Sequence, residues 1–207
     1  MASTNTVITI ARQYGASGRF TGEILSELTG MACYDRELIT MAVDKSGLKE
    51  DVIESYDEKA QSSLLYTLAV GSVDYGTPVP LSFHMPMSDK LYIMQSNIIR
   101  ELADKSSCII VGRCADHVLS ENASRVAVFL KADLPVRAER VAERHNISVS
   151  EAQDMCIKTD RRRASYYSHY TGQKWGRADL YDLIIDTTRV GARGAAETIK
   201  KYVESLK

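Results

Sequence analysis

The residues best suited to chemistry lie in a short loop near the start of the chain. An apolar, β-branched run at residues 7–10 leads into a turn that contains Gly15 and Gly18, and an amphipathic stretch follows. In the order strand, glycine loop and helix, backbone N–H groups and the positive end of the helix point at a bound anion. This order predicts a phosphate-binding loop, whose members are Gln13, Tyr14, Gly15, Ala16, Ser17, Gly18, Arg19, Phe20 and Thr21.

The loop departs from the pattern G-x-x-x-x-G-K-[ST] at three positions. Gln13 stands at the first glycine, Arg19 at the lysine and Phe20 at the hydroxyl residue. Arginine keeps the positive charge but offers a fork of donors, so Arg19 is expected to hold phosphate with a different geometry. Thr21, one residue later, is the candidate for the hydroxyl beside Mg²⁺. The alternative is an ordinary strand-to-helix turn whose glycines serve only tight packing.

Charged residues also follow two other apolar runs of the chain. Arg113 and Asp116 come after the third run. Asp35 and Arg36 come after the second. In open α/β sheets, ligands bind beyond the carboxyl ends of the strands, so these side chains are expected to meet Arg19 on one rim. A single arginine in such a place is most often a surface charge, but its repetition at several strand ends favours a binding site.

A basic helical stretch is a third candidate. Arg137, Arg140 and Arg144 recur at i, i+3 and i+7, which places them on one face of a helix. Like charges at this spacing repel unless an anion lies between them. Glu143 allows the alternative of a solvated, salt-bridged face, and the spacing by itself favours that alternative.

A fourth cluster, DRRR, begins at Asp160 and ends at Arg163, two residues that can pair at i, i+3. Residues 125–177 carry 11 Lys and Arg against 6 Asp and Glu, in a chain whose net charge is −1. A basic block in a near-neutral chain indicates a local anion site. Arginines beside the tyrosines of residues 166–170 are also typical of RNA binding. The low net charge argues against a nucleic-acid partner.

The elements that must position these residues are visible as five short apolar runs. They lie between helical patterns, as expected for buried parallel strands of a wound α/β sheet, and they occupy residues 7–11, 31–34, 108–112, 125–130 and 183–186. Residues 91–102 and 195–206 show the helical period. We expect one domain over residues 1–207, with an inserted helical lobe at 35–90 and an arginine-rich lid region at 133–178.

Several classes of protein are disfavoured by the composition. The four cysteines are far apart, with no C-x-x-C pair, which favours reduced thiols. The four histidines lack metal-ligand spacing, so no zinc site is expected. The N-terminus does not resemble a signal peptide, and apolar runs are too short to span a bilayer. We therefore expect a cytoplasmic protein without a membrane partner.

The segments ITIARQYGASGR, CYDRELI, IIVGRCADHVL, DRRR and YDLIIDTT, in this order, closely resemble the cytidylate kinase-like family of nucleoside monophosphate kinases, within the P-loop superfamily. The resemblance covers nearly the whole chain and is weakest over residues 45–90. It implies a five-stranded parallel sheet flanked by helices, with an acceptor-binding lobe and a lid.

The resemblance also implies roles for the charged residues. Residues 13–21 hold the phosphates of ATP, and residues 187–190 lie near its adenine. Arg137 and Arg140 are lid arginines, which act as catalytic cations with Arg19 and Arg163. The acceptor nucleotide is bound by Asp35, Arg36, Arg113, Asp116, Asp160 and Arg163.

The leading hypothesis is therefore ATP- and Mg²⁺-dependent phosphoryl transfer to a nucleoside monophosphate, and CMP or dCMP is the first choice of acceptor. Phosphoryl transfer needs positioning and charge neutralisation rather than a covalent nucleophile. Cytidylate kinases have glycine and lysine where this chain has Gln13 and Arg19, and their acceptor loop differs from Asp35-Arg36-Glu37. Two alternatives stay open: a nucleotide-binding regulator without catalysis, and a P-loop kinase for another small acceptor.

Overall fold

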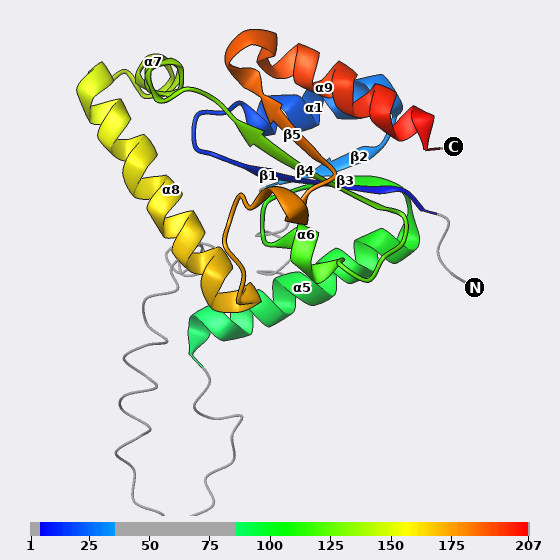
Figure 1. Ribbon diagram of the computed structural model, residues 1–207. Helices are drawn as coiled ribbons and strands as arrows, with labels where there is room; N and C mark the ends of the chain where they lie inside the picture. Colours follow the sequence, from blue (N-terminus) through cyan, green and yellow to red (C-terminus); the bar gives the residue numbers. More distant parts are fainter. Residues whose placement is uncertain (1–4, 36–85, 207) are drawn as a thin grey trace, which may run out of the picture.

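Five strands form one parallel sheet at the centre of the computed structural model, which describes residues 5–35 and 86–206 (Figure 1). The sheet order is β2-β3-β1-β4-β5, and all four neighbouring pairs are parallel. The strands are β1 Val7–Arg12, β2 Ala32–Tyr34, β3 Cys108–Val111, β4 Arg125–Lys131 and β5 Leu183–Asp186. The predicted fold class is confirmed, and the strand bounds differ from the prediction by one residue at most.

The central strands are apolar because both faces of the sheet are covered. Ile8 of β1 lies opposite Ile109 of β3 and Val126 of β4, and all three side chains are buried. A parallel strand buried on both faces requires a nearly continuous hydrophobic run rather than an alternating pattern. This requirement is why the short runs in the sequence predicted the strands well.

Two layers of helices enclose the sheet (Figure 1). On one face, α1 (Gly18–Thr29) and α9 (Thr187–Ser205) pack over Ile10 and Leu130. On the other face lie α5 (Met87–Lys105) and the short α6 (Ala115–Val118). The stripe predicted at residues 91–102 is the middle of α5. The backbone of α9 breaks at Gly191, so the predicted final helix is the part after this break.

A helical hairpin lies beyond the carboxyl ends of the strands (Figure 1). It consists of α7 (Leu134–His145) and α8 (Val149–Thr171). A capping box between Ser148 and Glu151 starts α8, since each residue accepts a hydrogen bond from the other's backbone N–H. The 3₁₀ turn Ala178–Leu180 then returns the chain to β5.

Most of the predicted lobe at residues 35–90 lies outside the described residues, and so does the predicted site residue Arg36. Both stay predictions. All four cysteines carry free thiols. In the two described stretches, no helix combines the length and the apolar character that crossing a membrane requires.

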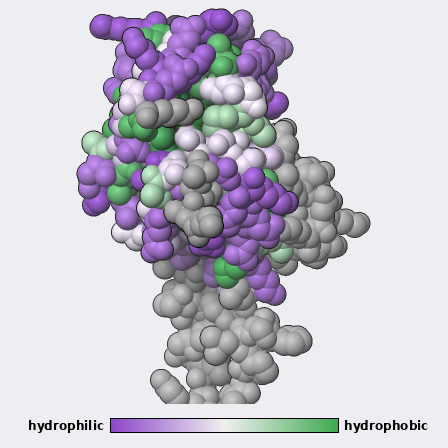
Figure 2. Space-filling model, turned by 90° about the vertical axis from the view of Figure 1, so that its right-hand side faces the viewer, coloured by the Kyte–Doolittle hydropathy of each residue, from purple (hydrophilic) through white to green (hydrophobic). Residues whose placement is uncertain are grey.

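Figure 2 shows the side of the molecule that carries both described chain ends. Hydrophilic residues dominate its upper part, and hydrophobic residues are interspersed below them. The strands end on the opposite side of the molecule (Figure 1).

Candidate active site

The loop between β1 and α1 has the backbone of an anion site. Gly15 and Ser17 both have positive φ, 80° and 60°, and Ser17 caps α1 without a side-chain hydrogen bond. Within the described residues, the backbone N–H groups of Gly15, Ser17 and Gly18 have no acceptor. The first turn of α1 also lacks an acidic residue. These open donors at a helix N-terminus can bind an anion.

The loop is held in this shape by a buried ion pair between α7 and α8. The Nη1 atom of Arg137 lies 2.6 Å from Asp160 Oδ2 and donates to the carbonyl oxygen of Tyr14 at 3.0 Å. The backbone N–H of Tyr14 donates to Asp160 Oδ1 at 2.7 Å. Only 6% of Arg137 is exposed. The resemblance implies a catalytic lid role for Arg137 and acceptor binding for Asp160, whereas in the structure both side chains contact the loop backbone.

Arg140 and Gln13 add further contacts to the same loop. Arg140 Nη2 donates to the carbonyl oxygen of Thr187 at 2.8 Å, and its Nη1 lies 3.5 Å from the carbonyl oxygen of Gly15. The side-chain oxygen of Gln13 accepts from the N–H of Ala132 at 3.1 Å. Gln13 thus fastens the loop to the end of β4, at the position where the usual pattern has glycine.

Two predicted loop residues, Arg19 and Thr21, contact neighbouring groups of α1 and of the loop itself. Arg19 is 60% exposed on α1, where its Nε lies 2.8 Å from Glu23 Oε1. Thr21 is fully buried, and its hydroxyl donates to the carbonyl oxygen of Ser17 at 3.0 Å. Phe20 is half exposed, and the guanidinium of Arg144 lies over its ring at 5.1 Å. The proposed catalytic role of Arg19 and the metal role of Thr21 stay predictions.

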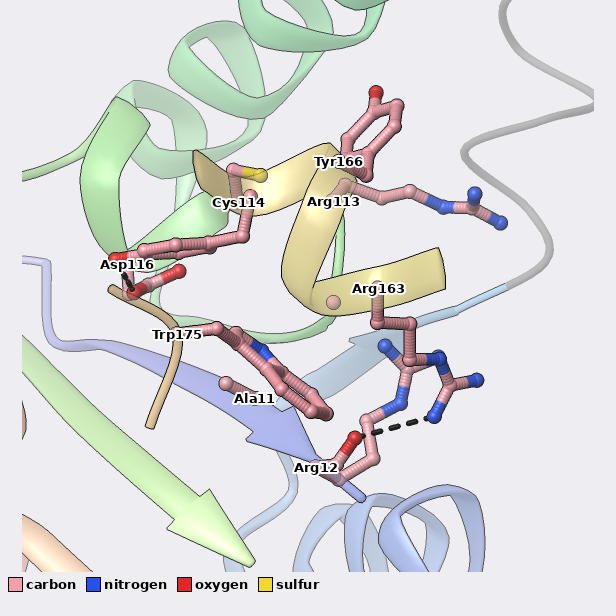
Figure 3. A pocket seen from close by; sticks show the side chains of 10 residues that line it. Ala11, Arg12, Arg113, Cys114, Asp116, Arg163, Tyr166 and Trp175 are labelled. Atoms are coloured by element: carbon pink, nitrogen blue, oxygen red, sulfur yellow. Dashed lines mark hydrogen bonds between the residues drawn. The ribbon is translucent and has the colours of Figure 1, made fainter. Parts of the chain in front are cut away.

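A pocket opens beside this loop, at the ends of β1 and β3 (Figure 3). The space between its walls is about 410 Å³ when the open solvent at its mouth is included. Three arginines, a buried carboxyl group and several aromatic rings line it: Arg12, Arg113, Arg163, Asp116, Tyr166, Tyr167 and Trp175. Arg163 Nη1 donates to the carbonyl oxygen of Arg12 at 3.1 Å, so α8 is joined to the end of β1.

The backbone after β3 has an unusual conformation. Gly112, Arg113 and Cys114 have φ values of 83°, 59° and 53° in succession. Two of the three are not glycine, and a left-handed conformation costs such residues roughly 1 kcal/mol each. This turn places Arg113 in the pocket and starts α6, which carries Asp116. Strained backbone of this kind is concentrated at functional sites.

Asp116 is a buried acid at the wall of the pocket. It is 5% exposed, and the hydroxyl of Tyr167 donates to its Oδ2 at 2.7 Å. Burial raises the pKa of the Asp116 carboxyl above its ordinary value, although the hydrogen bond from Tyr167 acts in the opposite direction. Its backbone carbonyl accepts from Arg125 Nη1. Asp116 is therefore a rigid acceptor or donor, depending on its protonation.

Some of the residues that were predicted to share one rim lie together in the structure. Arg113, Asp116 and Arg163 line one pocket, and Asp35 lies at its edge, with Oδ1 3.5 Å from Arg12 Nη2. Asp160 faces the loop instead, and Arg19 lies on the outer surface of α1.

Arg12 is a site residue that the sequence analysis missed. It is the last residue of β1, and its position at a strand end, beside those of Asp35 and Arg113, was the signal that could have found it.

Known proteins share this fold and parts of this sequence. The model of the cytidylate kinase-like family matches residues 7–189. The cytidylate kinase of Methanopyrus kandleri is 32% identical over 115 residues, 52% of this chain and 60% of the relative. That of Methanothrix thermoacetophila is 35% identical over 108 residues, 52% of this chain and 61% of the relative. These matches thus span about 60% of the relatives' length.

Solved structures resemble the chain over nearly its full length. An uncharacterized protein from Eubacterium ventriosum has a TM-score of 0.70 at 26% identity, covering 97% of this chain and 99% of that one. A shikimate kinase from Acinetobacter baumannii, in complex with shikimate, has a TM-score of 0.54 at 15% identity, covering 99% and 96%. The second likeness shows the fold alone. With the family model matching most of its length, the chain belongs to the cytidylate kinase-like family.

Proposed function

We propose that the protein transfers a phosphoryl group from ATP to a nucleoside monophosphate, most readily CMP or dCMP. The observation that carries this proposal is the meeting of two sites at the end of β1. A loop with open backbone donors lies on one side, and a pocket lined by three arginines lies on the other. The similarity to cytidylate kinases, at about 30% identity, supports the choice of acceptor.

The residues suit the demands of this reaction. Phosphoryl transfer needs two substrates aligned in line and the charge on the moving group neutralised. In the proposal, the N–H groups of Gly15, Ser17 and Gly18 bind the ATP phosphates. Arg113 and Arg163 bind the acceptor's phosphate, and Asp116 orients the nucleoside. The buried pair of Arg137 and Asp160 keeps the loop in place rather than touching the phosphates.

Mg²⁺ fits this site as a partner of the nucleotide. The described residues hold no group of three His, Cys, Asp or Glu side chains that could bind a metal. Mg²⁺ is commonly bound through one or two protein groups together with substrate phosphates and water, so a dedicated protein site is not required. It neutralises phosphate charge when bound. The Thr21 hydroxyl donates to Ser17 and keeps free lone pairs, but the residue is fully buried, so it can supply a ligand oxygen only if the loop opens around it.

The proposal is tested by measuring ADP release by the purified full-length chain, with MgATP and a panel of nucleoside monophosphates. We expect faster turnover with CMP or dCMP than with the monophosphates of the other bases. The panel extends to small hydroxylated acids and sugars, because the fold is shared with kinases of such acceptors. If folded protein binds ATP but none of these acceptors is phosphorylated, phosphoryl transfer to a small acceptor is refuted.

A second candidate is a nucleotide-binding protein without turnover. It is favoured by the placement of Arg19, which pairs with Glu23 on the surface of α1 instead of facing the loop mouth. This candidate requires that ATP and CMP raise the melting temperature without ADP release. For the kinase and for the protein without turnover, the partner in this proposal is a small molecule. The four free thiols suit the reducing cytoplasm, which we propose as the location.

A further inference from the structure

Arg12 occupies a channel that two glycines keep open. A Cβ atom added at Gly18 would lie 2.5 Å from Arg12 Cγ. A Cβ atom added at Gly112 would collide with Arg12 Nη1. Neither contact is possible between real atoms, so a side chain at either position would displace Arg12. The glycine that opens α1 therefore makes room for an arginine as well as for a phosphate.

The side chain of Arg12 runs through this channel, and its guanidinium lies in the pocket. Figure 3 shows Arg12 beside Arg163, and Arg113, which follows β3 in the chain, lines the same pocket beside Tyr166. Arg12 is only 15% exposed, and its Nη2 lies 3.5 Å from Asp35 Oδ1, a loose ion pair. The other acid of the pocket, Asp116, is buried against Tyr167, where burial favours its neutral form. Among the described residues that line the pocket there are thus three guanidinium groups and one carboxyl group, a composition that favours binding of a multiply charged anion.

Arg12 and Arg19 differ in the geometry that a phosphate ligand needs. Arg19 follows Gly18, where the usual pattern has lysine, but its side chain runs along the outside of α1 toward Glu23. Arg12 starts from the other end of the loop and ends inside the pocket. A fork of donors held in a narrow channel loses little freedom when it binds a phosphate.

We propose that Arg12, not Arg19, takes the place of the missing lysine and binds a phosphoryl group in the pocket formed with Arg113 and Arg163. The inference rests on the proposed function in one respect: the phosphoryl group belongs to ATP or to the acceptor. Asp35 holds Arg12 in position before the ligand arrives, and the phosphate competes for the same guanidinium.

The test compares four variants of the full chain. Arg12→Met removes the charge, and Arg12→Lys keeps a charge in the same channel. Arg19→Met tests the rival arginine. Arg193→Met is the matched control, since Arg193 is 71% exposed on α9 and pairs with Glu197 at i, i+4. Binding is measured as the rise in melting temperature caused by inorganic pyrophosphate, and kinetics are measured with MgATP and CMP varied separately.

We expect Arg12→Met to abolish stabilisation by pyrophosphate and to lower kcat by about 100-fold or more, as loss of a charge-stabilising donor does. Arg12→Lys should recover part of both losses, and Arg19→Met should lose less than Arg12→Met. Arg193→Met should match the natural sequence. If only the KM for ATP rises in the Arg12 variants, the phosphoryl group that Arg12 binds belongs to ATP. If only the KM for CMP rises, that phosphoryl group belongs to the acceptor.

The inference is overturned if Arg12→Met keeps pyrophosphate binding and turnover while Arg19→Met loses both. If Arg12→Met does not fold, Arg12→Lys takes its place: the inference is overturned if Arg12→Lys keeps full pyrophosphate binding and kcat while Arg19→Met loses both. If the natural sequence shows no turnover, the proposed function fails by itself. The pyrophosphate measurement then still decides whether Arg12 is a phosphate ligand.

Discussion

The guanidinium of Arg137 lies 2.6 Å from the carboxylate of Asp160 and also donates to the carbonyl oxygen of Tyr14. One buried ion pair thus joins α7, α8 and the loop after β1. The family resemblance implies that Arg137 is a lid arginine, whereas here it contacts the loop backbone and Asp160. The shape of the phosphate loop therefore depends on the position of the helical hairpin.

Breaking this pair should destabilise the protein strongly. Arg137→Met leaves Asp160 as a partly buried charge without its cation, and Asp160→Asn does the converse. Each is expected to lower the free energy of unfolding by about 3 kcal/mol, as for other buried pairs that lose one partner. The measurement is urea denaturation, with Arg193→Met as a surface control expected to change it by less than about 0.5 kcal/mol.

The double variant of Arg137 and Asp160 separates the pair from its surroundings. The second substitution removes the charge that the first left unpaired. The loss of stability in the double variant should therefore be clearly smaller than the sum of the losses in the two single variants. Strict additivity would show that the two side chains act independently and that the ion pair does not hold the loop.

A pair of glycine substitutions should separate strain from a blocked channel. Gly112 and Gly30 both have positive φ, 83° and 73°, so alanine at either site should cost roughly 1 kcal/mol of stability. The Cβ atom of Gly112→Ala would displace Arg12, while that of Gly30→Ala would have no atom within 4 Å. Only Gly112→Ala should therefore weaken pyrophosphate binding and turnover. Equal losses in both variants would show that the channel has no role.

Local patterns in the sequence predicted the fold but not the partners of the charged residues. The strands are short, continuous apolar runs, which packing on both faces requires, and they were predicted almost to the residue. The i, i+3 spacing allows Asp160 to pair with Arg163, yet Asp160 pairs with Arg137 of the neighbouring helix. Which helices pack together depends on the whole fold, and the period of one helix does not contain that information.

Arg12 shows the same limit at the site. The room for its side chain comes from two glycines, Gly18 and Gly112, which come together only once β1 and β3 are neighbours in the sheet. By contrast, the surface pair of Arg19 and Glu23 is an i, i+4 contact that the helical period alone permits.

Thr187 should be more important to stability than its size suggests. It is fully buried, and its hydroxyl lies within hydrogen-bond distance of Arg140 Nη1, of Lys131 O and of Ala16 O, at 3.2, 3.2 and 3.3 Å. Thr187→Val keeps the shape but leaves buried partners unsatisfied, at a cost of about 1–3 kcal/mol. Thr198→Val, on the exposed side of α9, is the control and should change stability by less than about 0.5 kcal/mol. Equal effects in urea denaturation would contradict a central role for Thr187.

The pH dependence of stability should have opposite signs at Asp116 and Asp186. Burial raises the folded-state pKa of Asp116 above its ordinary value of 3.8. Above pH 3.8 the unfolded chain gains from ionising this group before the folded protein does, so stability is lost as the pH rises toward the folded-state pKa. Asp116→Asn removes this penalty and keeps an acceptor for Tyr167. The variant should therefore gain stability relative to the natural sequence between pH 4 and pH 8.

Asp186 provides the matched comparison. Hydrogen bonds from Thr188 and the nearby Lys131 lower its pKa to about 2, so its contribution is present above pH 3.8 and is lost as the pH falls through about 2. The deficit of Asp186→Asn should be small, because the side chain is 39% exposed and screened, and it should vanish at low pH. Urea denaturation at intervals from pH 2 to pH 8 measures both variants. A constant difference between Asp116→Asn and the natural sequence over pH 4 to 8 would mean that Asp116 does not resist ionisation in the folded protein.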